Sequence, residues 1–112
     1  MYKNIEKNRF LLKFTDIIKY IGDGLRPIEE GEQVFLANHI FCVGIIKEVL
    51  NETHVFGLCL RSLRPTEEIP YEINVIVKKM RFEVEIECKC QCPSGSNGKC
   101  KHCVGLLYYL QA

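Results

Sequence analysis

The residues of this chain best suited to chemistry are its cysteines, five of which crowd into one short C-terminal stretch. The sequence has seven cysteines, and the clustered ones are Cys88, Cys90, Cys92, Cys100 and Cys103. A cluster of this kind, with an odd total, is typical of metal binding rather than of a disulfide framework. The N-terminus, MYKNIEKNRF, also lacks the apolar segment of a secretory signal. We therefore expect an intracellular protein, nuclear or cytoplasmic, that holds a metal near its C-terminus.

Two pairs within the cluster have the spacing of zinc ligands. Cys90 and Cys92 lie two positions apart at the end of a predicted strand, so their thiols leave the same face. Cys100 and His102 follow a loop of sequence PSGSNGK, where a predicted helix begins, and the positive end of a helix favours thiolates. Structural zinc takes four nitrogen or sulfur ligands in a tetrahedron. The spacing therefore predicts one structural Zn²⁺ held between a strand, a loop and the start of a helix.

Other thiols in the cluster leave alternative ligand sets open. Cys103 adjoins His102 and would replace it in an all-thiolate site, while Cys88 would replace Cys92 in the first pair. We interpret both thiols as core residues, because Cys103 begins the apolar stripe of the last helix and Cys88 continues the apolar face of the preceding strand. Disulfides, or buried thiols without a metal, are the remaining alternative.

The first half of the chain predicts a helix, a loop and a hairpin. A short helix is expected up to Gly22, capped by Thr15 or Asp16, and the turn-rich residues 26–32 (RPIEEGE) are expected to form a loop. Two runs rich in β-branched and aromatic residues, 39–50 and 54–63, predict a β-hairpin. Its cysteines, Cys42 and Cys59, are expected to be buried there as small hydrophobic residues.

Two further strands and a helix complete the predicted α+β domain. Residues 71–79 and 81–92 follow a turn at 64–70 and alternate apolar and polar side chains, with Phe82, Val84 and Ile86 on one face and Glu83, Glu85 and Glu87 on the other. The last residues, CKHCVGLLYYLQA, predict a helix with an apolar stripe. The fold class is thus a small, mostly antiparallel sheet with a short N-terminal helix and a C-terminal zinc-bound strand–loop–helix.

The ligand spacing also carries a family resemblance. The segment CQCPSGSNGKCKH, of pattern C-x-C-x7-C-x-H, resembles the SWIM-type zinc finger, a motif named for SWI/SNF-type helicases and Mutator-type transposases. The glycine-containing linker and the hydrophobic helix VGLLYYL belong to the same resemblance. It implies a β-hairpin followed by a helix, with Cys90, Cys92, Cys100 and His102 as ligands. It also implies DNA or protein partners, because SWIM fingers are credited with both.

The segment ahead of the finger carries a second resemblance. GEQVFLANHIFCVGI is similar to the region before SWIM motifs in transposon- and phage-recombinase-related animal proteins, where a YqaJ-type nuclease domain often follows. An alternative function is therefore that of an accessory domain in a larger recombinase or transposase-type enzyme. We divide a single domain, 1–112, into an N-terminal helix and loop (1–30), a β-rich segment (31–80) and the SWIM-type zinc finger (81–112).

Charge narrows the choice of partner. Fifteen basic and 14 acidic residues leave a net charge of +1, so the whole chain is not a basic nucleic-acid-binding protein. From Cys88 onward there is no acidic residue, and Lys89, Lys99 and Lys101 are candidate nucleic-acid contacts. The middle of the chain is acidic and would repel DNA. A protein partner would instead dock on an exposed strand edge or on the surface of Tyr108 and Tyr109.

Catalysis finds no support in the sequence. A Cys-His pair two residues apart at a helix start points its groups in different directions, and the chain has no P-loop and no nucleophile elbow. The row of glutamates on the fourth strand is interpreted as a solvated face. No apolar run is long enough to cross a membrane. We therefore expect a non-enzymatic module with no small-molecule substrate and no membrane contact.

Overall fold

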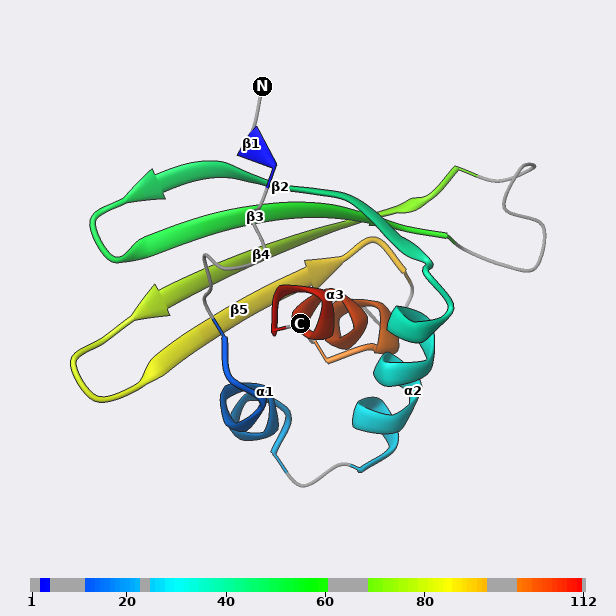
Figure 1. Ribbon diagram of the computed structural model, residues 1–112, viewed down its shortest axis with the longest axis horizontal. Coiled ribbons are helices and arrows are strands. Elements are labelled where there is room, and N and C mark those ends of the chain that lie inside the picture. The colour runs from blue at the N-terminus through cyan, green and yellow to red at the C-terminus, as the bar shows by residue number, and fades with distance from the viewer. Residues whose placement is uncertain (1–2, 5–11, 23–24, 61–68, 93–98, 112) are drawn as a thin grey trace.

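An antiparallel sheet with helices on one face forms the structure, as Figure 1 shows. The computed structural model describes residues 3–4, 12–22, 25–60, 69–92 and 99–111. In chain order the elements within these ranges are β1 (Lys3–Asn4), α1 (Phe14–Ile21), α2 (Leu25–Leu36), β2 (Ile40–Val49), β3 (Glu52–Cys59), β4 (Tyr71–Lys79), β5 (Val84–Cys90) and α3 (Lys101–Gln111). The predicted α+β class, with its N-terminal and C-terminal helices, is confirmed.

The sheet is a meander in which every strand pairs with its neighbour in the sequence. The order is β1-β2-β3-β4-β5, and all the pairings are antiparallel. Val75 of β4 lies opposite Val55 of β3 on one side and opposite Cys88 of β5 on the other. Because alternate residues share a face, the inward side chains of β3, β4 and β5 form one continuous apolar surface.

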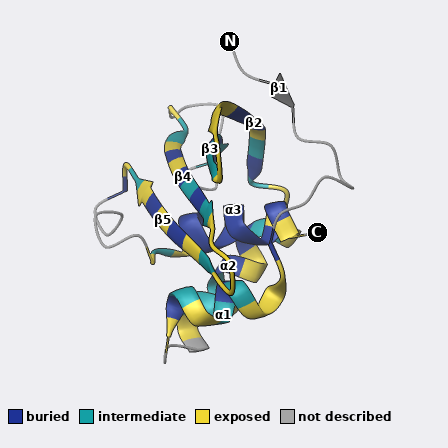
Figure 2. Cartoon of the chain, turned by 90° about the vertical axis from the view of Figure 1, so that its left-hand side faces the viewer, coloured by how far each residue is buried: buried dark blue, intermediate teal, exposed yellow. Residues whose placement is uncertain are grey.

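That apolar surface is covered by the helices, which all lie on the same side of the sheet (Figures 1 and 2). Helix α3 is buried on almost every side, with Leu106 and Leu107 fully enclosed, while α1 contributes the buried side chains of Ile17 and Ile21. Figure 2 shows the buried colour along α3. The opposite face of β5, with its row of glutamates, is exposed as predicted.

Helices α2 and α3 approach closely because glycines lie where they cross. A Cβ added at Gly31 of α2 would collide with the side chain of Val104, and one at Gly105 of α3 would lie 2.9 Å from Cγ1 of Val34. Contacts under 3.0 Å are essentially never seen for real Cβ atoms. Because glycine has no side chain beyond a hydrogen atom, Gly31 and Gly105 let the two helix backbones approach closely.

Helix α2 corrects the loop predicted for residues 26–32. Proline is tolerated in the first turn of a helix, where Pro27 lies, because the N–H it lacks has no partner there. Gly31 serves the crossing with α3 rather than a turn. The boundary placed between residues 30 and 31 consequently falls inside a helix.

Helix α1 confirms the predicted short N-terminal helix but has a different cap. Its N-cap is Lys13, whose backbone N–H donates to the Asp16 carboxylate at 2.9 Å, while Thr15 lies within the helix. At the other end Gly22 has a φ of 81° and donates its N–H to the Ile18 carbonyl. A left-handed residue after the last turn is the usual place for glycine.

Three side chains lie differently from their predicted positions. Phe82 precedes β5 and is 89% exposed, so it does not share the buried face of Ile86. Cys42 is exposed and has a φ of 52°, beside a register shift between β2 and β3, whereas Cys59 is buried as predicted. Tyr108 is buried in the core and leaves Tyr109 as the exposed member of the predicted tyrosine surface. The predicted turn at 64–70 and the PSGSNGK loop lie largely outside the described residues.

At the far end of the sheet the turns carry exposed apolar side chains. Asn51, in the turn after β2, exchanges hydrogen bonds with the backbone of Lys79 at 2.9 Å, which places the two turns side by side. Their exposed apolar residues are Val49, Leu50, Met80 and Phe82, which we call the hairpin tips. Leu50 has a φ of 51°, a conformation that costs a bulky residue energy.

Candidate metal centre

The end of β5 and the start of α3 bring four predicted ligands together. The ligand atoms of Cys90, Cys92, Cys100 and His102 all lie within 4.8 Å of one another. Nδ1 of His102 is 3.8 Å from Sγ of Cys90 and 3.8 Å from Sγ of Cys100. The sequence prediction that these side chains converge is therefore confirmed by the geometry, and the group could hold a metal ion.

Their separations are close to those of a tetrahedral zinc site. Zn–S bonds near 2.3 Å and Zn–N bonds near 2.0–2.1 Å place tetrahedral ligand atoms about 3.5–3.8 Å apart. Tetrahedral sulfur and nitrogen ligands of zinc lie about 3.5–3.6 Å apart, so the two sulfur–nitrogen distances of 3.8 Å are slightly longer than in a bound site. Three sulfurs and one imidazole nitrogen are also a donor set that zinc prefers. A metal ion would thus need only small side-chain movements to bind.

Backbone pairing beyond the end of β5 positions the first ligand pair. Cys90 is the last residue of the strand, opposite Ile73. The backbone N–H of Gln91 then donates to the Glu72 carbonyl at 3.2 Å, and the Glu72 N–H donates to Oε1 of Gln91 at 2.9 Å. These bonds fix the chain between the two cysteines, so that Gln91 faces solvent and Cys92 turns inward.

The first turn of α3 positions the second pair. The Val104 N–H donates to the Cys100 carbonyl at 3.1 Å, so Cys100 stands at the helix start, and His102 follows within the first turn. The Cys103 N–H donates to Sγ of Cys100 at 3.5 Å. A thiolate here accepts a backbone hydrogen bond and lies at the positive end of the helix dipole, and both effects stabilise its charge.

Hydrogen bonds within the cluster favour the thiolate form of Cys100 over that of its neighbours. Hydrogen bonds from the thiols of Cys103 and Cys90, and from His102, lower the pKa of the Cys100 thiol. The pKa of Cys90 and that of Cys103 are raised, in each case first by the hydrogen bond to Cys100. A metal that binds thiolates would displace the thiol protons of this cluster.

His102 is held by an aromatic neighbour that the sequence did not reveal. Its ring lies 5.1 Å from the ring of Tyr71, measured between centroids, and its side chain is nearly buried. Because Nδ1 faces the sulfurs, the imidazole presents Nε2 away from them. Tyr71 begins β4 and has no spacing relation to the ligands, so only the sheet register could have identified it.

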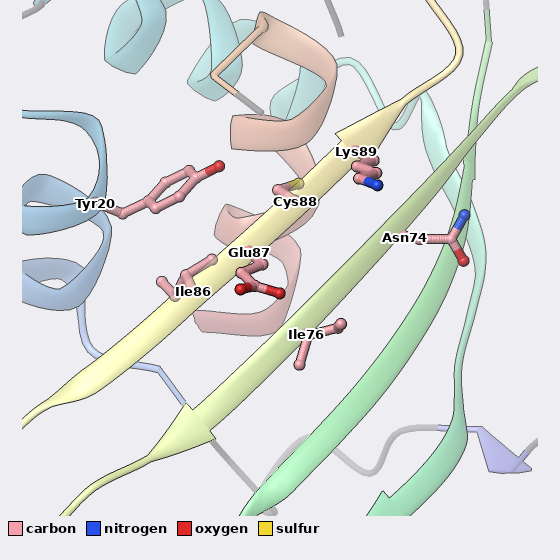
Figure 3. Close-up of a pocket in the computed structure, with 7 residues that line it drawn as sticks. All are labelled: Tyr20, Asn74, Ile76, Ile86, Glu87, Cys88 and Lys89. Carbon is pink, nitrogen blue, oxygen red and sulfur yellow. The ribbon is translucent and has the colours of Figure 1, made fainter. Parts of the chain in front are cut away.

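The three lysines predicted to touch nucleic acid do not share one surface. Lys99 and Lys101 line the same pocket of about 330 Å³, into which Cys92, Cys100 and His102 also open. Lys89 lies on the far side of β5, beside Glu87, and lines a different pocket, shown in Figure 3. The Lys99 ammonium also lies 5.9 Å from the centre of the Tyr20 ring. The basic surface beside the metal centre is therefore that of Lys99 and Lys101.

The alternative ligands Cys103 and Cys88 lie on the core side of the cluster. Both are buried, as predicted for core residues. The Cys103 thiol is in hydrogen-bond contact with Cys88 as well as with Cys100 and Cys90. Tyr20 reaches from α1 toward this part of β5 (Figure 3), and burial together with the neighbouring thiols raises the pKa of its hydroxyl.

Comparisons with known proteins add no family assignment. No family model, curated protein or solved structure matches this chain. The SWIM resemblance therefore rests on the ligand spacing and on the strand–helix order. None of the helices in the described parts of the chain combines the length and apolar character needed to cross a membrane.

Proposed function

We propose that this chain is a non-enzymatic, SWIM-type zinc module that recognises nucleic acid through the surface beside its metal centre. The observation that supports the zinc site is the convergence of three sulfurs and one imidazole nitrogen within 4.8 Å. Four protein ligands close the coordination shell of zinc and leave no position for an activated water. The metal would act structurally, by joining the end of β5 to the start of α3.

The ligand set is tested by metal analysis of the purified chain and its variants. One zinc per chain is expected in the wild type, with loss in Cys92→Ser, weaker binding in His102→Ala and full retention in Cys103→Ala. Exposed Cys42→Ser is the control for loss of a thiol as such. Zinc lost from Cys103→Ala and fully retained by His102→Ala would contradict the assignment.

Nucleic-acid recognition is supported by the position of Lys99 and Lys101 on the same pocket as the ligands. Both lysines are exposed. Exposed lysines can contact the phosphates of a nucleic acid without a deep groove. Three thiolates leave the zinc site at −1 and Glu30 lies on the same pocket, so Lys99 and Lys101 balance the local negative charge and are the cations that a phosphate would meet there. Lys89 lies next to Glu87 on another pocket and is not part of the proposed surface.

The test is DNA binding at several salt concentrations. The double variant Lys99→Glu with Lys101→Glu should lose affinity, and the slope of log K against log salt should decrease by about one for each lysine. Lys47→Glu, an exposed lysine on β2, is the matched charge control. Absence of DNA binding at low salt, or equal losses in the control, would contradict this function.

A protein-interaction module is the second candidate, favoured by the hairpin tips. Leu50 and Phe82 are almost fully exposed on neighbouring turns, where they contribute little to the core. A protein partner bound there would be lost in Leu50→Ser with Phe82→Ser and retained in the lysine double variant. The reverse pattern in a binding assay would favour nucleic acid.

A further inference from the structure

Cys103 is a fully buried thiol that touches the metal centre without belonging to its ligand set. It is the residue after His102, in the first turn of α3, and its side chain is 0% exposed. Its backbone N–H already donates to Sγ of Cys100 at 3.5 Å, and its thiol lies near those of Cys90, Cys100 and Cys88, although its sulfur is not among the four ligand atoms that converge within 4.8 Å. Cys103 therefore borders two of the same sulfurs that Nδ1 of His102 approaches.

From this juxtaposition we propose that Cys103 is an exchangeable ligand that gives the centre a second binding mode for softer metal ions. Zinc would be held by Cys90, Cys92, Cys100 and His102. A more thiophilic divalent cation would be held by the same three thiolates and Cys103, with His102 released. This inference rests on the metal-binding function proposed above and adds the class of ion that the centre selects.

The chemistry of the donors favours this division. Zinc accepts imidazole and thiolate ligands, whereas softer ions gain more from each additional thiolate. In the exchange, the bond from the metal to the neutral imidazole breaks and a bond to the Cys103 sulfur forms. The thiol proton passes to solvent, so there is no change of oxidation state and no further reactant is needed.

The surroundings can accommodate the extra negative charge of a four-thiolate site. The net charge of the centre would change from −1 to −2, at the first turn of α3, where the helix dipole favours anions. Lys99 and Lys101 stand at the rim of the same pocket. The pocket also reaches Cys92 and Cys100, which gives an ion a path to the sulfurs without unfolding.

His102 and Cys103 would exchange by local movements. His102 lies on the pocket side, where its ring contacts Tyr71, so the imidazole can leave toward the pocket. Cys103 lies on the core side, beside Cys88, and would approach the metal by side-chain rotation within the first turn of the helix. The bonds from the metal to Cys90, Cys92 and Cys100 would persist during the exchange and hold the end of β5 against the start of α3.

The experiment compares Zn²⁺ and Cd²⁺ bound to the full chain under reducing conditions. X-ray absorption counts the sulfur and nitrogen neighbours of each metal, and ¹¹³Cd NMR reports the number of thiolates. We expect three sulfurs and one nitrogen around zinc, and four sulfurs around cadmium. The same three-sulfur shell for both ions would overturn the inference and leave the zinc site standing, while a chain that binds neither ion would overturn the proposed function itself.

Variants assign the fourth sulfur. Cys103→Ala should return cadmium to a three-sulfur shell and lower its affinity roughly tenfold or more, with little change for zinc. His102→Ala should keep the cadmium shell and affinity and weaken zinc. Cys59→Ala, equally buried but on β3, is the matched control and should resemble the wild type with both ions. A cadmium shell unchanged in Cys103→Ala would also overturn the inference.

Discussion

Apolar and polar side chains alternate along β5 and the turn before it. The two ends of this segment nevertheless lie in different surroundings. At its C-terminal end, Cys90 lies among sulfur and nitrogen donors beneath the start of α3. Just before its N-terminal end, Phe82 lies in a turn and is almost fully exposed. Alternation along a strand predicts which face a side chain takes, whereas burial also needs an element to cover that face. The difference therefore comes from the covering helices, because the start of α3 lies over the metal-centre end, whereas near Phe82 the start of α1 leaves an open pocket.

Removal of the proposed zinc should have the largest effect on stability, because the ion would join the C-terminal end of β5 to α3. If free zinc is about a thousandfold above its Kd before chelator is added, chelation should lower the free energy of unfolding by about 4 kcal/mol. Thermal unfolding with and without chelator measures the change. Cys92→Ser should show no response to chelator, and an equally unresponsive wild type would contradict a structural role for the metal.

The next effect should come from the helix crossing that holds α3 over the sheet. Gly31→Ala places a methyl group against Val104 and should lower stability by about 1–3 kcal/mol, because the helices must separate. Urea unfolding measures it, with Glu29→Ala, an exposed change in the same helix, as the control. If the Gly31→Ala protein were as stable as the control, the close approach would not hold.

A smaller effect of opposite sign is expected at the hairpin tips. Leu50→Gly should raise the unfolding free energy by about 0.5–1 kcal/mol, because glycine adopts the left-handed backbone without the strain that leucine carries there. Val49→Gly, one residue earlier within β2, should instead destabilise the protein. Chemical denaturation distinguishes the two variants, and destabilisation by both would remove the strain assigned to Leu50.

The smallest change is expected for Phe82→Ser, which removes a large side chain that the core does not use. Stability should stay within about 0.5 kcal/mol of the wild type, and the zinc affinity should be unchanged. Ile86→Ala, a buried position on the strand that follows Phe82, should cost about 2–5 kcal/mol in the same melting experiment. Similar losses of stability in the Phe82 and Ile86 variants would mean that Phe82 also packs against the core.

The sequence predicted the metal centre and most of the sheet because both depend on short-range patterns. Cys90 and Cys92 need only the end of one strand, and Cys100 and His102 need only the start of one helix. Their approach to one another follows from the short segment between them. Alternation likewise located the inward residues of β4, where Ile73, Val75 and Val77 are all buried.

The incorrect predictions concern residues whose structure depends on distant partners. Pro27 and Gly31 resemble loop residues locally, and α2 forms because its apolar face packs on α3. Tyr108 lies outside the predicted apolar stripe, yet it is buried because aromatic rings from α1 and α2, Phe14 and Phe35, pack against it. Tyr71 reaches His102 only through the register of β4 with β5.

The meander order of the sheet has a consequence for the way in which the chain assembles. Each hairpin joins strands that are adjacent in the sequence, so its loop closes with little loss of chain entropy. The crossing of Gly31 with Gly105 instead joins parts of the chain that are distant in the sequence, so its closure costs more chain entropy. We therefore expect the hairpins to appear early in refolding and the seating of α3 to be the late step.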